Sequence, residues 1–233
     1  MRRHLAAASM GVVLVGLLGL VLAANAAGTA QFKQTFDFTY SPAKKGKSIG
    51  ISAGFSSTDP GLPGSKPDKA VTRWVTTLNR GTDIRTAGVY GQCRTGIGQL
   101  QAGQSCPASS RNGGGSAILD GTPAFGPTQF KVTAFNARKS ILFLLESTGP
   151  PVQRFAFKGT FSGLNLSTNI PRMQVFGVPV VITQFDVTLE RKRSGGKNYL
   201  TAPGHCGGRW TTKALFAFSD GSESREQVSQ RCR

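Results

Sequence analysis

The stretch of sequence that decides the fold is WTTKALFAF (residues 210–218), followed by SDGS (residues 219–222) and ESREQVSQR (residues 223–231). Apolar side chains recur at every second position of its first part. Because a strand places successive side chains on opposite faces, this pattern predicts a strand with one buried face. The Asp220-Gly221 pair favours the positive φ angles of a tight type I′ turn, so the whole stretch predicts a hairpin.

Alternation of the same kind recurs along most of the chain. The segments that show it are Gln31–Tyr40, Ile49–Phe55, Ala70–Leu78, Phe130–Ala134, Ile141–Leu145, Phe155–Phe161 and Val181–Arg191. Clusters typical of turns occur at residues 59–64, 112–115, 149–151 and 194–196, and one short helical turn is expected near Gln99–Gln104. About ten short strands with such turns predict an all-β fold, a two-sheet antiparallel β-sandwich stapled by disulfides, in a single domain.

Residues 1–26 have the composition of a secretory signal peptide. Arg2 and Arg3 precede an apolar run that ends at Ala24-Asn25-Ala26, and small residues are expected at a cleavage site. We therefore expect residues 27–233 to form a secreted domain, outside the cell or at the cell envelope, with no membrane span after cleavage. An uncleaved anchor is the alternative, because the apolar run is about twenty residues long.

All four cysteines, Cys93, Cys106, Cys206 and Cys232, lie in the part expected to be secreted. An even number of cysteines in an oxidising compartment predicts two disulfides, for which three pairings exist. Closure of short loops favours Cys93–Cys106 and Cys206–Cys232, and the predicted hairpin brings the second pair to one end. A metal site is not expected, because the chain has no closely spaced cysteine pair.

Three motifs carry a resemblance to a known group of proteins. They are FDFTYSPAKKGK (residues 36–47), CPASSRNGGGSA (residues 106–117) and a tail that begins with CGGRW (residues 206–210) and ends at Cys232. Together they resemble a set of secreted, Cys-paired, β-rich proteins from high-GC Gram-positive soil bacteria. The resemblance implies export, disulfides and a β fold. It implies no functional residues, because that group has no established activity.

The residue types needed for common catalytic sites are scarce. A catalytic triad needs a histidine base, and the only histidine after the signal, His205, lies in a glycine-rich loop beside Cys206. Asp186 and Glu190 share a strand face, but four residues separate them by roughly 13 Å, too far for a concerted pair. The spacings of calcium loops and phosphate loops are also missing, so no metal or cofactor is expected.

The excess of basic residues is the remaining feature. Without Arg2 and Arg3, 26 basic residues stand against 11 acidic ones, a net charge of +15. The basic residues cluster as Lys44, Lys45 and Lys47; as Arg191, Lys192 and Arg193 with Lys197 nearby; and as Arg225, Arg231 and Arg233. A surface of this charge attracts polyanions, so we expect the first two clusters to contact an anionic cell-wall polymer or polysaccharide. Nucleic acid is not the expected partner, because no recognition motif is present.

Other interpretations stay open at this point. The basic residues can serve only to keep an edge-rich β protein soluble. Asp37, Asp120 and Glu146 can converge in space, as a glycan- or ester-cleaving hydrolase would require. The 15 phenylalanines can line a cavity for an apolar ligand, although their alternation assigns most of them to the core. The first expectation is a non-enzymatic, envelope-associated protein with a binding or structural role.

Overall fold

The computed structural model describes residues 32–58, 67 and 69–233, and most of it is β-strand. The large sheet contains β1 (Lys33–Ser41), β2 (Gly50–Thr58), β3 (Val71–Thr77), β5 (Arg111–Gly121), β6 (Phe125–Ala137), β7 (Ser140–Ser147), β8 (Arg154–Ser162), β9 (Asn165–Asn169), β10 (Met173–Val175), β11 (Val178–Leu189), β15 (Arg209–Phe218) and β16 (Glu223–Arg231). Two small ladders pair β12 (Arg193–Ser194) with β13 (Lys197–Asn198), and β4 (Asp83–Ile84) with β14 (Leu200–Thr201). The helical elements are α1 (Ile97–Gln101) and a 3-10 turn at Ala108–Ser110. The predicted all-β fold is confirmed.

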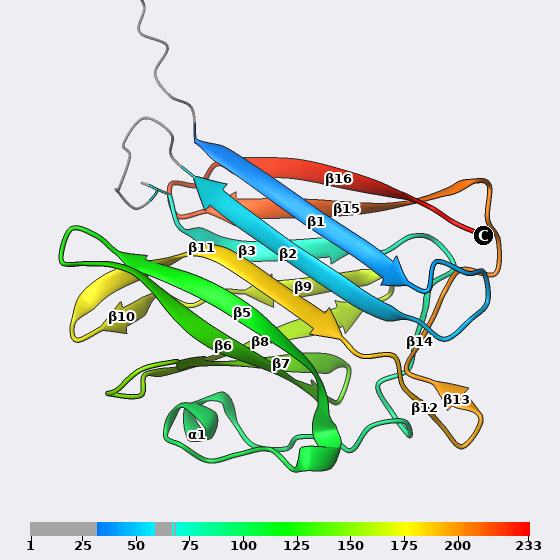
Figure 1. Cartoon of the computed structure of the whole chain (residues 1–233), viewed down its shortest axis with the longest axis horizontal. Coiled ribbons are helices and arrows are strands. Elements are labelled where there is room, and N and C mark those ends of the chain that lie inside the picture. The colour runs from blue at the N-terminus through cyan, green and yellow to red at the C-terminus, as the bar shows by residue number, and fades with distance from the viewer. Residues whose placement is uncertain (1–31, 59–66, 68) are drawn as a thin grey trace, which may run out of the picture.

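The large sheet is one antiparallel ladder that curves round until it is nearly barrel-shaped (Figure 1). Its strands are hydrogen-bonded in the order β1-β2-β11-β5-β6-β7-β8-β9-β3-β15-β16, and β10 joins β11 outside this path. The predicted two-sheet sandwich is therefore not confirmed, because the ladder passes round the molecule without a break. Alternation along a strand specifies a buried face, but it does not specify whether the strands belong to two sheets or to one curved sheet.

The edge strands β1 and β16 meet where the barrel would close. Eleven strands lie along the path and every neighbouring pair is antiparallel, so the two edge strands run in the same direction (Figure 1). An antiparallel ladder cannot form between them. A side chain bridges them: Gln230 Nε2 donates to Tyr40 O at 3.0 Å, and Gln230 Oε1 accepts from Tyr40 N at 2.7 Å.

The hairpin predicted from residues 210–231 is confirmed, with β15 and β16 paired in an unbroken register. Its turn is not the predicted type I′, because only Gly221 of the Asp-Gly pair has a positive φ, of 84°. Asp220 has another role: its Oδ1 accepts hydrogen bonds from the backbone N–H and the hydroxyl of Ser222, at 2.9 and 2.6 Å. A side chain that bonds the backbone two residues on stabilises a wider loop than the two-residue turn.

Aromatic side chains fill the interior of the barrel. Trp74 contacts Phe55 and Phe185 edge-on, with ring centroids 5.3 and 5.8 Å away, and stacks on Phe216 at 6.2 Å. All four side chains are buried. They come from β3, β2, β11 and β15, so this cluster joins strands that are far apart along the ladder, and edge-to-face pairs of this kind stabilise the core beyond the area they bury.

Strand β7 is buried on both faces. Its outer face is covered by the chain between β4 and β5, which contains α1 and the Cys93–Cys106 disulfide. Leu100 of α1 packs there in a second apolar cluster with Leu142 and Leu144. A strand buried on both faces shows a continuous apolar run, which explains the sequence Ile141–Leu145; alternation alone identified only its inner face.

One cluster predicted to be a turn lies inside a strand. The sequence analysis placed a turn at residues 112–115, but Gly113 and Gly115 belong to β5. A Cβ atom on Gly113 would collide with the backbone oxygen of Thr188, and one on Gly115 with that of Asp186. The glycines are therefore needed because β5 lies very close to β11 here. A glycine cluster is typical both of turns and of such close approaches, so the sequence alone does not distinguish the two.

The remaining sequence predictions concern three turns, one helical turn and the signal peptide. Residues 149–151 connect β7 to β8 and residues 194–196 connect β12 to β13, as predicted. Helix α1 overlaps the helical turn expected near Gln99–Gln104. The predicted signal peptide and the predicted turn at residues 59–64 lie outside the described residues. Among the residues that are described, no helix has the length and apolar character needed to cross a bilayer.

Candidate functional site

Both predicted disulfides are present. Cys93 is bonded to Cys106, and Cys206 is bonded to Cys232. The second disulfide joins the loop before β15 to the residue directly after β16, close to the Gln230–Tyr40 bridge. No cysteine in the described part of the chain is free. This end of the barrel, where the chain also finishes, carries the candidate site.

The loop between β1 and β2, which we call the lysine loop (residues 42–47), contributes three exposed cations. They are Lys44, Lys45 and Lys47. The last residue of the chain holds the first half of this loop: Lys45 N donates to Arg233 O, and Arg233 N donates to Ala43 O, both at 2.9 Å. The lysine loop is thus paired with the chain end through backbone groups alone.

The second half of the lysine loop is held by the chain after β14. Gly46 N donates to Pro203 O at 3.1 Å, and Ala202 N donates to Lys47 O at 2.9 Å. Gly46 has a φ of 64°, a conformation that glycine adopts without strain. The loop therefore has a support on each side, and its cations project from a defined backbone.

The segment after β11, which we call the arginine segment, contributes the second predicted cluster. Its members are Arg191, Lys192 and Arg193. The carbonyl oxygen of Lys192 accepts hydrogen bonds from Tyr199 N at 3.0 Å and from Ser48 Oγ at 3.5 Å. The ammonium of Lys192 lies 4.1 Å from the centroid of the Tyr90 ring, a cation–π contact that orients it.

Two buried tyrosines support the arginine segment from the interior. Tyr90 and Tyr199 pack edge-to-face with ring centroids 4.8 Å apart. The Tyr90 hydroxyl donates to Glu190 O at 3.2 Å, and Asn112 Nδ2 donates to the Tyr199 hydroxyl at 2.9 Å. Burial raises the pKa of Tyr90 to about 12, with a smaller contribution from the Glu190 carboxylate, and burial also raises the pKa of Tyr199 well above its usual range. Both rings therefore stay neutral and act as fixed supports.

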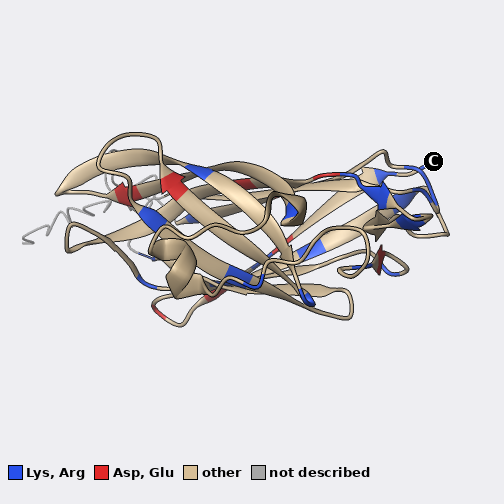
Figure 2. Ribbon diagram, turned by 90° about the horizontal axis from the view of Figure 1, so that it is seen from below, with Lys and Arg blue, Asp and Glu red and all other residues tan. Residues whose placement is uncertain are grey.

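These segments and the chain end lie together at one end of the molecule, where Figure 2 shows mostly Lys and Arg; we call this group of cations the basic end. Its members are Lys44, Lys45, Lys47, Arg191, Lys192, Arg193, Lys197, Arg209, Arg231 and Arg233. All are exposed except Lys192, which is half-buried. Four ion pairs occur in the described part of the chain, and none of them includes a member of the basic end. Among the described residues, the cations of this surface therefore have no ion-pair partner.

The third predicted basic group is divided by the fold. Arg231 and Arg233 lie at the basic end, where Arg231 is opposite Arg209 in the β15–β16 ladder. Arg225 is near the other end of β16, where it lies 3.6 Å from the carboxylate of Glu223. At about 3.3 Å per residue, six positions of extended strand separate Arg225 from Arg231 by roughly 20 Å.

Two carboxylates that the sequence raised as hydrolase candidates have structural contacts. Asp120 is buried, and its Oδ1 accepts hydrogen bonds from the backbone N–H and the hydroxyl of Thr122. Glu146 Oε1 lies 2.9 Å from Arg154 Nε in a partly exposed ion pair. These contacts account for both side chains without a substrate.

Two other carboxylates flank a glycine on the outer face of the sheet. Asp37 and Asp186 lie one strand to either side of Gly54, so their backbones are about 10 Å apart. The sequence did not reveal this relationship, because it depends on the pairing of β1, β2 and β11. Asp37 is exposed and Asp186 is half-buried, and the two lie on a strand face and not in a pocket given for the described residues. Glu190, the partner considered for Asp186 from sequence, lies beyond the end of β11.

His205 is exposed in the loop before β15, and its contact is made by the backbone. Its carbonyl oxygen accepts a hydrogen bond from Trp210 Nε1 at 3.0 Å. Over the described residues, no group of three or more His, Cys, Asp or Glu side chains gathers in a way that could hold a metal ion.

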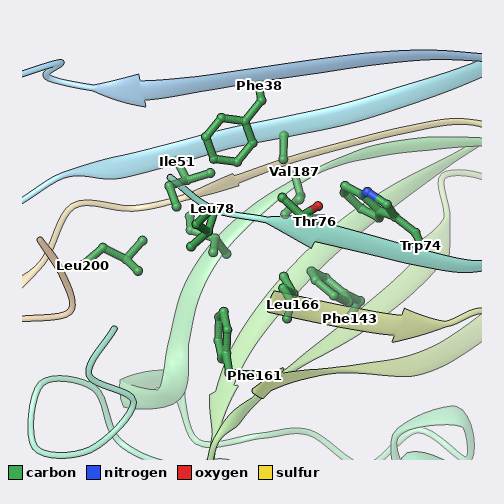
Figure 3. Close-up of a pocket in the computed structure, with 12 residues that line it drawn as sticks. Phe38, Ile51, Trp74, Thr76, Leu78, Phe143, Phe161, Leu166, Val187 and Leu200 are labelled. Atoms are coloured by element: carbon green, nitrogen blue, oxygen red, sulfur yellow. The ribbon is translucent and has the colours of Figure 1, made fainter. Parts of the chain in front are cut away.

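The phenylalanine-rich interior is packed closely where a ligand cavity was considered. The cavity drawn in Figure 3 has a volume of about 30 Å³ and is lined by Phe38, Trp74, Phe143 and neighbouring side chains. Sites for small molecules commonly measure about 300–1,000 Å³. This cavity is therefore a small packing defect, and the aromatic rings around it act in the core.

Comparison with protein-family models, with curated proteins and with solved structures finds no match for the chain. The basic end is thus the strongest functional candidate, and it rests on geometry. The sequence did not reveal two of its parts: the backbone contacts of Arg233, and the tyrosine pair below the arginine segment. Only the predicted Cys206–Cys232 pairing indicated that the chain end belongs to this region.

Proposed function

We propose that the protein is a non-enzymatic, envelope-associated binding protein whose basic end contacts anionic cell-surface polymers. Polymers of this class carry phosphate groups or sugar carboxylates. The observation that carries the proposal is the convergence of the lysine loop, the arginine segment and Arg233, three parts of the chain that are far apart in sequence. All of their cations except Lys192 are exposed, and none of them forms an ion pair with a carboxylate of the described residues.

Counter-ion release supplies the driving force for such binding. A polyanion holds a layer of condensed small cations, and a protein surface that neutralises its charges sets those ions free. The supports of the basic end also favour binding, because cations on a fixed backbone lose less conformational freedom when a ligand arrives.

The distribution of charge favours this proposal over a purely solubilising role. Cations that only prevent aggregation are expected along the edge strands of a sheet, which here are β1 and β16. The two strands together carry Lys33, Arg225 and Arg231, whereas the lysine loop and the arginine segment lie outside both strands. Clustering at one end is better explained by a shared ligand.

The proposed location is outside the cell or at the envelope, where polymers of this class are found. Two disulfides and the expected signal peptide support this location. Membership in the set of secreted, Cys-paired, β-rich proteins is part of the same proposal. Nucleic acid is not proposed as the partner, since the chain has no recognition motif for it.

A titration tests the proposal. Inorganic polyphosphate and polygalacturonate serve as probes, with binding measured by fluorescence anisotropy over a series of NaCl concentrations. We expect binding to both, with an affinity that falls steeply as salt rises. The triple variant Lys44→Gln, Lys45→Gln, Lys47→Gln should bind about tenfold more weakly and reduce the slope of log K against log salt by about 2 to 3.

A matched triple variant controls for net charge. Lys131, Lys158 and Lys213 are exposed on the outer faces of β6, β8 and β15, away from the basic end. Their replacement by Gln removes the same charge and should change affinity by no more than about twofold. Absence of binding by the natural chain, or equal losses in the two triple variants, would contradict the proposal and favour a solubilising role.

A further inference from the structure

The chain end positions the lysine loop through its backbone. The N–H of Arg233 donates to Ala43 O, and its backbone oxygen accepts from Lys45 N, both at 2.9 Å. The guanidinium of Arg233 is exposed and takes part in none of the ion pairs found among the described residues. The positional role of residue 233 can therefore be separated from its charge.

The Cys206–Cys232 disulfide connects the two supports of the lysine loop. Cys232 immediately precedes Arg233, which holds the first half of the loop. Cys206 lies three residues after Pro203, whose carbonyl oxygen accepts from Gly46 N at 3.1 Å and holds the second half. One covalent bond thus keeps both supports at a constant separation.

Without that bond, the chain end would depend on a few backbone hydrogen bonds. Besides the two contacts of Arg233, Cys232 N donates to Gly208 O at 3.2 Å. A segment held by so few backbone hydrogen bonds can open locally. Such opening releases Ala43 and Lys45, and the cations of the loop would then have to be ordered when a polymer binds.

We infer that the Cys206–Cys232 disulfide controls the affinity of the basic end for anionic polymers by tethering Arg233 against the lysine loop. This inference rests on the proposed function and adds its regulation. When a dithiol reduces the disulfide, the S–S bond breaks, two electrons and two protons convert the two sulfurs to thiols, and the dithiol becomes a disulfide. The basic end then binds tightly in an oxidising compartment and more weakly in a reducing one.

Two variants of residue 233 separate tethering from charge. A chain that ends at Cys232 lacks the backbone contacts and the guanidinium, whereas Arg233→Gln lacks only the guanidinium. We expect the shortened chain to bind polyphosphate about 3- to 10-fold more weakly than Arg233→Gln, because its lysine loop is no longer held in place. Hydrogen exchange should show faster exchange of the Lys45 amide in the shortened chain only.

Two pairs of cysteine variants then test the disulfide itself. Cys206→Ser with Cys232→Ser should bind weakly with or without dithiol. Cys93→Ser with Cys106→Ser should bind as the natural chain does, and both should lose affinity when dithiol is added. Where a cysteine pair does not fold, the two residue-233 variants decide the question.

The outcomes distinguish the inference from the proposed function. If the natural chain binds polyphosphate and every variant binds equally well, the inference is overturned and the proposed function stands. If the natural chain does not bind, the proposed function fails and the inference fails with it, whatever the exchange rate of Lys45.

Discussion

The side-chain amide of Gln230 occupies the place of a peptide group opposite Tyr40. Its Nε2 donates to the Tyr40 carbonyl at 3.0 Å and its Oε1 accepts from the Tyr40 N–H at 2.7 Å. An odd number of antiparallel strands leaves the edge strands β1 and β16 parallel, so this side chain joins edges that have no common ladder. Three residues later, Arg233 pairs with the lysine loop. The closure of the barrel and the formation of the basic end therefore depend on the same short segment.

Replacement of Gln230 should lower stability more than its position in an edge strand suggests. Gln230→Ala leaves both backbone groups of Tyr40 without partners, and Tyr40 is only 2% exposed. An unsatisfied buried group costs about 1–3 kcal/mol, so we expect the free energy of unfolding to fall by about that amount. Urea denaturation measures it. Gln227→Ala, at an exposed position of the same strand, should change stability by no more than about 0.5 kcal/mol; equal effects would show that the bridge is unimportant.

We expect position 115 to require glycine, because β5 and β11 lie very close together there. A Cβ atom there would collide with the backbone oxygen of Asp186, so Gly115→Ala must push β5 away from β11. We expect a loss of about 1–3 kcal/mol, the usual cost of overpacking. Gly126→Ala in β6 is the control, because no atom of the described residues lies within 4 Å of its added Cβ. Thermal unfolding of the two variants side by side checks the prediction, and an unchanged midpoint for Gly115→Ala would contradict it.

The turn between β10 and β11 should be stabilised by a substitution. Phe176 is 71% exposed and has a φ of 53°, followed by Gly177 at 80°, the two positive angles of a type I′ turn. Asn adopts such angles at lower cost than Phe, and little apolar contact is lost. Phe176→Asn should therefore raise the free energy of unfolding by about 0.5–1 kcal/mol. A decrease on denaturant titration would mean that Phe176 makes a stabilising contact.

Alkaline solution should weaken the fold through the tyrosines under the arginine segment. Burial raises the pKa of Tyr90 from 10.0 to about 12, so between these pH values the unfolded chain has lost a proton that the folded chain keeps. Stability is then complete below pH 10 and falls as the pH rises towards 12. Tyr199 adds to this fall, because its pKa is also raised by burial.

Denaturant midpoints measured from pH 8 to pH 12 test this dependence. Tyr90→Phe keeps the ring but has no ionisable hydroxyl, so its stability should fall less steeply with pH than that of the natural chain. Parallel curves for the two proteins would show that Tyr90 ionises as freely in the folded state as in the unfolded state.

Local patterns predicted the features that depend on neighbouring residues. The hairpin of residues 210–231 follows from alternation around Asp220-Gly221, and its ends then bring Cys206 and Cys232 together. The single curved ladder could not be predicted in this way, because strand order depends on contacts between distant segments. Gly113 and Gly115 show the same limit: a glycine cluster is equally typical of a turn and of a strand that closely approaches another.

The sequence predicted most of the residues that form the candidate site, but it predicted less of how they are arranged. The lysine loop and the arginine segment were identified as runs of like charge, and the fold brings them to one end. Arg225 was grouped with Arg231 and Arg233 by proximity in sequence, but an extended strand carries it to the other end. The contacts of Arg233 are made by backbone atoms. Because every residue type has these atoms, the sequence did not indicate the contacts.

Protection of lysines from an amine-reactive acylating reagent tests most directly whether the basic end binds anionic polymers. Acylation is followed residue by residue by mass spectrometry, with and without inorganic polyphosphate. The proposal predicts that the polymer slows acylation of Lys44, Lys45, Lys47 and Lys197 and leaves Lys131, Lys158 and Lys213 unchanged. Equal protection of both groups, or protection of the second group alone, would contradict it.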